Sequence, residues 1–190
     1  MSRLRIFNQA DGDTPLAVHT DHAAIERELR AAGVRFERWQ AGAPIAPGAS
    51  QDDVIAAYRN DIDRLMTEEG YQAVDVISLK PDHPERAVLR QKFLNEHRHS
   101  EDEVRFFVAG AGQFYLHLGE QVFEVLCEAG DLIGVPDGVR HWFDMSQSPS
   151  FVAIRLFTNP EGWVARFTGD TISSRFAPMQ PHVSARADAA

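Results

Sequence analysis

Three histidines and one glutamate are spaced in this sequence like the ligands of a metal ion. His97 and His99 stand two residues apart, Glu103 follows four residues after His99, and His141 lies further along the chain. Side chains two apart in an extended segment project from the same face, so His97, His99 and Glu103 share one face. Imidazole nitrogens and carboxylates suit first-row transition metals. The spacing therefore predicts a metal site.

The donor types narrow the choice of metal. Four such ligands without a thiolate suit Fe(II), Ni(II), Mn(II) or Co(II), and they leave two octahedral positions open for a chelating substrate. The alternative is a closed structural zinc site, which usually includes cysteine, and the motif has none nearby. Four further histidines are expected to be ordinary core or surface residues: His19, His22, His83 and His182.

Glycines and a proline complete the pattern around the four candidate ligands. The first block covers residues 97–110, and the second covers residues 130–141 with Pro136-Asp137-Gly138 inside it. These blocks resemble the two signature motifs of the cupin superfamily, in the form with three histidines and one glutamate. Two departures concern positions that are not ligands: Gln91 in place of an opening glycine, and Met145 in place of a closing asparagine.

The string from Glu96 to Gly110, EHRHSEDEVRFFVAG, narrows the resemblance to one family. It is similar to the motif of the acireductone dioxygenases, the metal-dependent, oxygen-using enzymes of methionine salvage. The resemblance extends over residues 1–176. It implies a mainly β fold, the cupin double-stranded β-barrel (jelly-roll-like), with an N-terminal mixed α/β extension.

The resemblance also implies roles for individual residues. Four of them would hold one Fe(II) or Ni(II) per chain: His97, His99, Glu103 and His141. Four would contact the substrate, the first of them as the catalytic residue: Arg105, Phe93, Phe143 and Trp163. The substrate would be 1,2-dihydroxy-3-keto-5-methylthiopentene. With O2, the Fe form would yield formate and 4-methylthio-2-oxobutanoate, and the Ni form would yield formate, carbon monoxide and 3-methylthiopropanoate.

Arg105 lies two residues after Glu103 and therefore on the same, inward face. Arginine is almost never buried without an anionic partner, because a desolvated charge costs several kcal/mol. The partner is either the anionic substrate, whose paired oxygens match a guanidinium, or a carboxylate of the core.

Other residues near the motif have competing interpretations. The sequence pattern alone favours a core role over a role in the substrate pocket for three aromatic residues: Phe93, Phe143 and Trp163. The resemblance makes the core role and the pocket role equally good interpretations. Asp102 and Asp144 could orient a histidine N–H or lie solvated at the surface. Glu96 points away from the ligand face and receives no role.

Strand and helix patterns define the elements that must position these residues. Before residue 94, strands at 4–7, 34–39 and 74–79 alternate with helices that begin at Thr20-Asp21, at Ser50 and at Pro84. One apolar helical stripe runs from residue 54 to 66. Six short strands follow, which favours a barrel: 103–108, 113–118, 121–127, 131–135, 141–145 and 151–157.

The patterns predict a single cupin domain over residues 1–176. Within it, residues 1–94 form the mixed region, residues 95–158 the motif-bearing barrel core, and residues 159–176 a closing segment. Residues 177–190 are expected to be a flexible tail.

Composition limits the possible partners and setting. The chain has 190 residues, 44% hydrophobic content and a net charge of −9, so one sizeable core is expected and binding to nucleic acid or anionic membranes is not. The single cysteine, Cys127, lies in an apolar run and fits a small core residue of a cytoplasmic protein. No stretch has the length of a membrane span. We expect a monomer whose partners are the acireductone and O2.

Two other functions share the same motifs. A metal-dependent cupin isomerase acting on sugar phosphates would need several basic residues in the barrel, whereas the first motif strand offers only Arg105. A non-catalytic cupin that binds a small ligand often carries a helix-turn-helix domain, which the acidic N-terminal region does not resemble.

Overall fold

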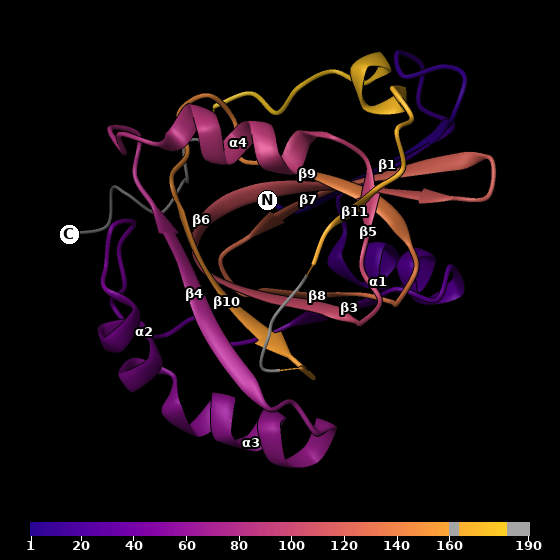
Figure 1. Ribbon diagram of the computed structural model, residues 1–190. Coiled ribbons are helices and arrows are strands. Elements are labelled where there is room, and N and C mark those ends of the chain that lie inside the picture. The colour runs from indigo at the N-terminus through magenta and orange to yellow at the C-terminus, as the bar shows by residue number, and fades with distance from the viewer. Residues whose placement is uncertain (160–163, 182–190) are drawn as a thin grey trace.

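The computed structural model describes residues 1–159 and 164–181, and its centre is a barrel of antiparallel strands (Figure 1). The strands are β1 (Arg3–Asn8), β2 (Ala17–His19), β3 (Arg35–Arg38), β4 (Ala73–Leu79), β5 (His97–Arg98), β6 (Glu103–Leu118), β7 (Gln121–Glu128), β8 (Asp131–Val135), β9 (Arg140–Asp144), β10 (Phe151–Phe157) and β11 (Arg166–Phe167). Sheet A has the order β11-β5-β9-β6-β7-β1-β2, and sheet B has the order β4-β10-β6-β8-β3. The predicted mainly β, double-stranded barrel is confirmed.

Strand β6 belongs to both sheets. Its first half pairs with β8 and β10, and its second half pairs with β7 and β9. The sequence predicted two strands here, over 103–108 and 113–118, but the structure has one strand of 16 residues. The strand passes between the sheets at Gly110, where φ is 67°. A Cβ atom at this position would lie 1.8 Å from the carbonyl oxygen of Ser150, so no larger residue fits.

The helices cover the outside of the barrel. They are α1 (His22–Ala31), α2 (Gln51–Ala57), α3 (Arg59–Glu69), α4 (Arg86–Leu94) and the 3-10 helix η1 (Ile172–Arg175). Val54, Ile62 and Leu65 pack against the outer face of sheet B. The single stripe predicted for residues 54–66 is divided between α2 and α3, because the backbone leaves helical geometry at Tyr58.

The N-terminal region adds strands to the barrel sheets. β1 pairs with β7, β3 with β8, and β4 with β10. The interior cluster accordingly combines residues from both halves of the chain, including Leu4, Ile25, Phe107 and Phe143. The division at residue 94 stays a prediction, and in the described chain the two sides of that boundary share a core.

The segment after β11 packs on the outer face of sheet A. Phe176 packs on Trp142 there with ring centroids 5.5 Å apart, and Ile172 belongs to the same cluster. Tyr115 donates a hydrogen bond of 2.7 Å to the carbonyl of Ala177. Met179 is buried, and its backbone N–H donates to Asp144. The ordered packing thus continues beyond the predicted start of the tail at residue 177, whereas residues 182–190 lie outside the described residues. Among the helices of the described ranges, none combines the length and apolar character needed to cross a membrane.

The bend of β6 can be tested by comparing two glycines with similar backbone angles. Gly119 has φ 62° and open space around its Cβ position, whereas Gly110 has φ 67° and the Ser150 carbonyl in contact. Gly119→Ala should destabilise the fold by about 1–2 kcal/mol through backbone strain alone. Gly110→Ala should add a packing cost, for a total of about 2–5 kcal/mol. Urea unfolding measures the free energy of unfolding of both variants. Equal losses would show that the close approach of the Ser150 carbonyl does not add a packing cost at position 110.

Candidate metal centre

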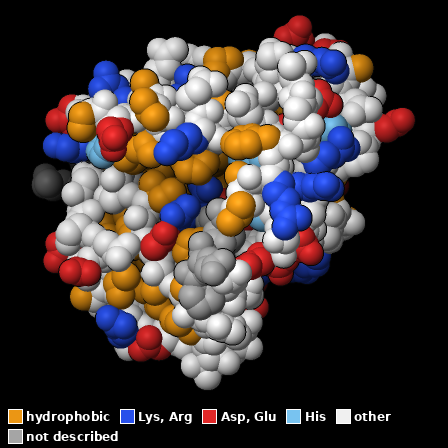
Figure 2. Space-filling view, in the orientation of Figure 1, with side chains coloured by type: hydrophobic (Ala, Val, Ile, Leu, Met, Phe, Trp, Pro, Cys, Tyr) orange, Lys and Arg blue, Asp and Glu red, His pale blue; other side chains and the backbone are white. Residues whose placement is uncertain are grey.

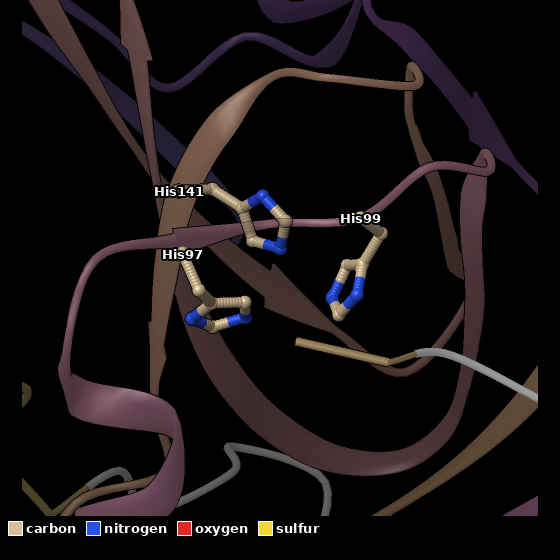
Figure 3. Close-up of side chains that lie close together, drawn as sticks. All are labelled: His97, His99 and His141. Atoms are coloured by element: carbon tan, nitrogen blue, oxygen red, sulfur yellow. The ribbon is translucent and has the colours of Figure 1, made fainter. Parts of the chain in front are cut away.

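The four predicted ligands come from three neighbouring parts of the barrel. His97 on β5 and His141 on β9 are direct partners across the strands. His99 follows β5, and Glu103 is the first residue of β6. Figure 3 shows the three imidazole rings turned toward one another from these segments. All four side chains are buried, so the barrel withdraws them together from solvent.

The distances within this cluster suit a single ion. The three histidines each offer a ring nitrogen, and these nitrogens lie within 4.8 Å of one another. Oε2 of Glu103 lies 3.1 Å from Nε2 of His99 and 3.1 Å from Nε2 of His141. Neighbouring ligands of an octahedral ion with bonds of about 2.1 Å are about 3 Å apart. Glu103 is thus placed as a neighbour of both imidazoles around one ion.

Backbone carbonyls orient each imidazole. Nδ1 of His97 lies 2.7 Å from the carbonyl of Asn95, Nδ1 of His141 lies 2.8 Å from that of Val139, and Nδ1 of His99 lies 3.2 Å from that of Val164. A carbonyl oxygen can only accept, so each Nδ1 carries a proton, and in the neutral form of the imidazole Nε2 then has a free lone pair. A cation shared by the Nε2 atoms of His99 and His141 and by the carboxylate of Glu103 would fit these contacts of 3.1 Å.

The two carboxylates considered for this orienting role have other partners. Asp102 accepts a hydrogen bond from the backbone N–H of Asp137. Asp144 binds the guanidinium of Arg90 through both oxygens, at 2.7 and 2.8 Å, and so fixes α4 to β9. The Nδ1 atoms of the three candidate histidines face backbone carbonyls, and an orienting role of Asp102 or Asp144 stays a prediction.

Burial and local charges keep the cluster ready for a cation. Burial, followed by the neighbouring His141, lowers the pKa of His97 to about 4, so this imidazole is neutral near pH 7. Burial alone would raise the pKa of Glu103, but the charge of Arg105, followed by the close contacts with His141 and His99, holds it well below its usual value. The imidazole of His97 and the carboxylate of Glu103 are therefore in the protonation states in which these groups bind metals.

Arg105 lies beside the cluster and is also buried. Its Nε is 2.6 Å from Oε1 of Glu103. The salt bridge to a core carboxylate, which the sequence analysis gave as the alternative to a substrate contact, is therefore present. The carboxylate is that of Glu103, which is itself a candidate metal ligand. The guanidinium carbon lies 4.5 Å from the ring centroid of Phe143, 5.0 Å from that of Phe114 and 5.6 Å from that of Phe93. These rings hold the guanidinium in place by cation–π contacts.

The predicted aromatic residues differ in what the structure says of them. Phe93 on α4 meets Phe143 edge to face, with ring centroids 6.3 Å apart. Phe143 is buried in the interior cluster, whereas Phe93 is partly exposed. Hydrophobic side chains gather across the middle of the face in Figure 2, with basic side chains among them. Trp163 lies outside the described residues.

Two partly exposed residues on the inner face of sheet B escaped the sequence analysis. Arg155 on β10 is the register partner of Arg105 on one side and of Asp75 on the other, so all three share the inner face. Arg155 binds Asp75 through both carboxylate oxygens, at 2.7 and 2.5 Å. Alternation along 151–157 could have placed Arg155 inside with Phe151 and Ala153. The barrel thus contains a second basic residue, already paired with an acid.

Comparisons with known proteins agree with this geometry. The model of the ARD/ARD' family matches residues 3–165. Acireductone dioxygenase from Pseudomonas aeruginosa is 61% identical over 180 residues, which cover 95% of this chain and 99% of that protein. The enzyme from Stenotrophomonas maltophilia (strain K279a) is 59% identical over 181 residues, covering 95% and 98%. A solved structure, acireductone dioxygenase from Bacillus anthracis with a cadmium ion in its active centre, matches with a TM-score of 0.76 and 31% identity, over 88% of this chain and 98% of that one.

Fold, site and relatives together define a cupin of the metal-dependent dioxygenase class. The chain belongs to the ARD/ARD' family.

Metal removal and return should report directly on the cluster. Protein from which a chelator has removed the metal should take up about one Co(II) per chain. At a Co(II) concentration of a hundred times Kd, the ion should stabilise the fold by about 2.7 kcal/mol. His141→Ala should lose most of both effects because one neighbour of Glu103 is gone. His83→Ala, which alters a histidine outside the cluster, is the control. Titration calorimetry and thermal melts measure uptake; undiminished binding by His141→Ala would remove His141 from the site.

Proposed function

We propose that this protein is an acireductone dioxygenase of methionine salvage, which oxidises 1,2-dihydroxy-3-keto-5-methylthiopentene with O2. The observation that carries the proposal is the buried cluster of His97, His99, His141 and Glu103 with Arg105 against it. Relatives about 60% identical over nearly the whole chain bear the name of this enzyme. Membership of their family favours this reaction over a sugar-phosphate isomerase and over a non-catalytic cupin.

The proposed cofactor is one Fe(II) or Ni(II) per chain, held by His97, His99, Glu103 and His141. Three imidazoles and a carboxylate match the donor preferences of either ion. Bound there, the ion would supply a Lewis acid with two neighbouring open positions for the adjacent oxygens of the substrate. The residues around it would fix the ligand directions through the Nδ1 contacts to backbone carbonyls.

Arg105 is proposed as the catalytic residue that receives the anionic substrate. A guanidinium carries five N–H donors, so the contact of its Nε with Glu103 is compatible with a second contact to a substrate oxygen. Burial among aromatic rings strengthens such a charge-assisted hydrogen bond, because water does not compete for it. In this position Arg105 would favour the deprotonated, electron-rich form of the acireductone.

The aromatic wall is proposed to bind the methylthio end of the substrate. Phe93 and Phe143 stand edge to face beside Arg105, so an apolar group could lie against them while the oxygens of the substrate reach the ion. Trp163 is proposed to contribute to the same wall. These side chains would also exclude water from the reacting carbons. The monomeric state and the cytoplasmic location stay predictions.

The role of Arg105 can be separated from metal binding. Arg105→Gln should keep its metal at saturating concentration but lose at least about tenfold in kcat, since a charge-assisted contact contributes about 1.5–3 kcal/mol. Arg98→Gln removes an exposed charge from the opposite side of β5 and should keep its activity. Metal content and oxygen uptake are measured on the same samples. Parental kinetics in metal-replete Arg105→Gln would reduce Arg105 to a salt-bridge partner of Glu103.

The proposed reaction predicts that the bound ion selects the products. Apoprotein loaded with Fe(II) should give formate and 4-methylthio-2-oxobutanoate, and apoprotein loaded with Ni(II) should give formate, carbon monoxide and 3-methylthiopropanoate. Both ions find the same ligands, so both forms should consume O2. Gas analysis and mass spectrometry of the acids distinguish the products. Identical products would refute selection by the metal, and absence of oxygen uptake in both forms would refute the dioxygenase assignment.

A further inference from the structure

A second cluster of polar residues lies behind the candidate ligands, on the opposite face of sheet A. Glu96 precedes His97 and Arg140 precedes His141, so strand alternation turns both side chains away from the metal site. His117 on β6 is the register partner of Arg140 and shares its face. Glu96 and His117 are only 1% and 4% exposed, so this cluster belongs to the interior.

His117 joins the other members of the cluster. Its Nδ1 lies 2.5 Å from Oε1 of Glu96, and its Nε2 lies 2.9 Å from the amide oxygen of Gln9 and 3.3 Å from Nη2 of Arg140. A carboxylate can only accept, so Nδ1 carries a proton, and in the neutral imidazole Nε2 accepts from the guanidinium of Arg140 while the amide of Gln9 lies in contact with it. The imidazole therefore links the residue before one ligand with the residue before another.

Glu96 extends the cluster to the segment that follows β11. Oγ1 of Thr168 donates to Oε2 of Glu96 at 2.6 Å, and the backbone N–H of Thr168 donates to the carbonyl of Glu96 at 3.1 Å. The preceding residue, Phe167, lies over the His97 ring with centroids 5.9 Å apart. Glu96 thus connects His117 to the part of the chain that covers His97.

The strand that carries His97 is short. β5 is two residues long; it pairs with the equally short β11 through His97 and Arg98, and with β9 only through the single pair His97 and His141. So short a strand leaves the direction of the His97 ring sensitive to small backbone shifts, whereas a metal ligand must hold its geometry within about 0.5 Å. Side-chain links from behind would provide the missing restraint.

We propose that His117 is a positioning residue of the metal centre. By linking Glu96 to Arg140, it holds the backbones of β5 and β9 at the spacing that His97 and His141 need to share one ion. The inference rests on the proposed metal ligands. It gives a function to a buried histidine that does not face the ion.

Three substitutions separate the contacts of His117. Asn places an N–H donor close to the position of Nδ1, so His117→Asn should keep the link to Glu96 and lose those to Arg140 and Gln9. His117→Phe keeps the ring volume and loses both links. Arg140→Met leaves His117 and Glu96 in place and removes the link to β9. Arg140 is partly exposed, so this third variant folds even if a buried change at position 117 does not.

The affinity for Co(II) is measured by a competition titration between the full-length apoprotein and a chromophoric chelator. The visible spectrum of the bound Co(II) reports the coordination geometry, and the melting temperature of the apoprotein reports the stability of the fold. Loss of a positioning contact behind a metal ligand weakens affinity by about 10–100-fold. His117→Phe should lose at least about tenfold in affinity and show a changed Co(II) spectrum. His117→Asn and Arg140→Met should fall between His117→Phe and the parent.

The control is His22→Phe, because His22 also faces a carboxylate, Asp131, at 3.7 Å, but belongs to a different cluster. A merely structural role of His117 predicts that both Phe variants lower the melting temperature and leave the Co(II) spectrum unchanged. That result, or parental affinity in His117→Phe and Arg140→Met, would overturn the inference. If the parent protein bound no Co(II), the proposed metal function itself would fail, which is a distinguishable outcome.

Discussion

The buried charge of Glu103 is the constraint on which the rest of the barrel interior depends. A carboxylate that is 1% exposed costs several kcal/mol unless positive charge reaches it. The structure meets this need at both oxygens. Oε1 faces Arg105 at 2.6 Å, and Oε2 faces two imidazole nitrogens at 3.1 Å each, the place where a cation fits. Arg105 and a cation at the candidate metal site would thus both offset the negative charge of Glu103.

The path of β6 follows from this arrangement. Glu103 and Arg105 lie in the half of β6 that pairs with sheet B, whereas His141 lies on β9, which pairs with the other half in sheet A. One strand must therefore belong to both sheets and turn between them. Gly110 allows the turn because it accepts a positive φ and the contact with Ser150. The glycine that the cupin motif places at this position thus has a geometric reason.

Local patterns were sufficient to predict the candidate ligands but not their surroundings. The residue types and spacing predicted His97, His99 and Glu103 as one set, but residues 99–102 form a bend between β5 and β6 rather than one extended strand. The bounds of β8 and β10 were predicted correctly. The Asp75–Arg155 pair depends on the register of two strands far apart in sequence. The partners of the three Nδ1 atoms are backbone carbonyls, which carry no signature in the residue types. Asp102 directly precedes Glu103 and Asp144 lies three residues after His141, and an odd separation along a strand places two side chains on opposite faces.

The same alternation explains why a metal centre on strands needs support from both sides. Each ligand has neighbours that point to the reverse face of the sheet, and in this protein a further layer of chain covers part of that face. A polar residue buried there requires hydrogen-bond partners as strictly as a ligand requires its ion. Glu96 meets the requirement through His117 and Thr168, which come from β6 and from the segment after β11. Residues on the face opposite the ligands can therefore fix the backbone that carries the ligands. In a sequence, such residues can be recognised as ionisable residues that directly precede a ligand in a buried segment.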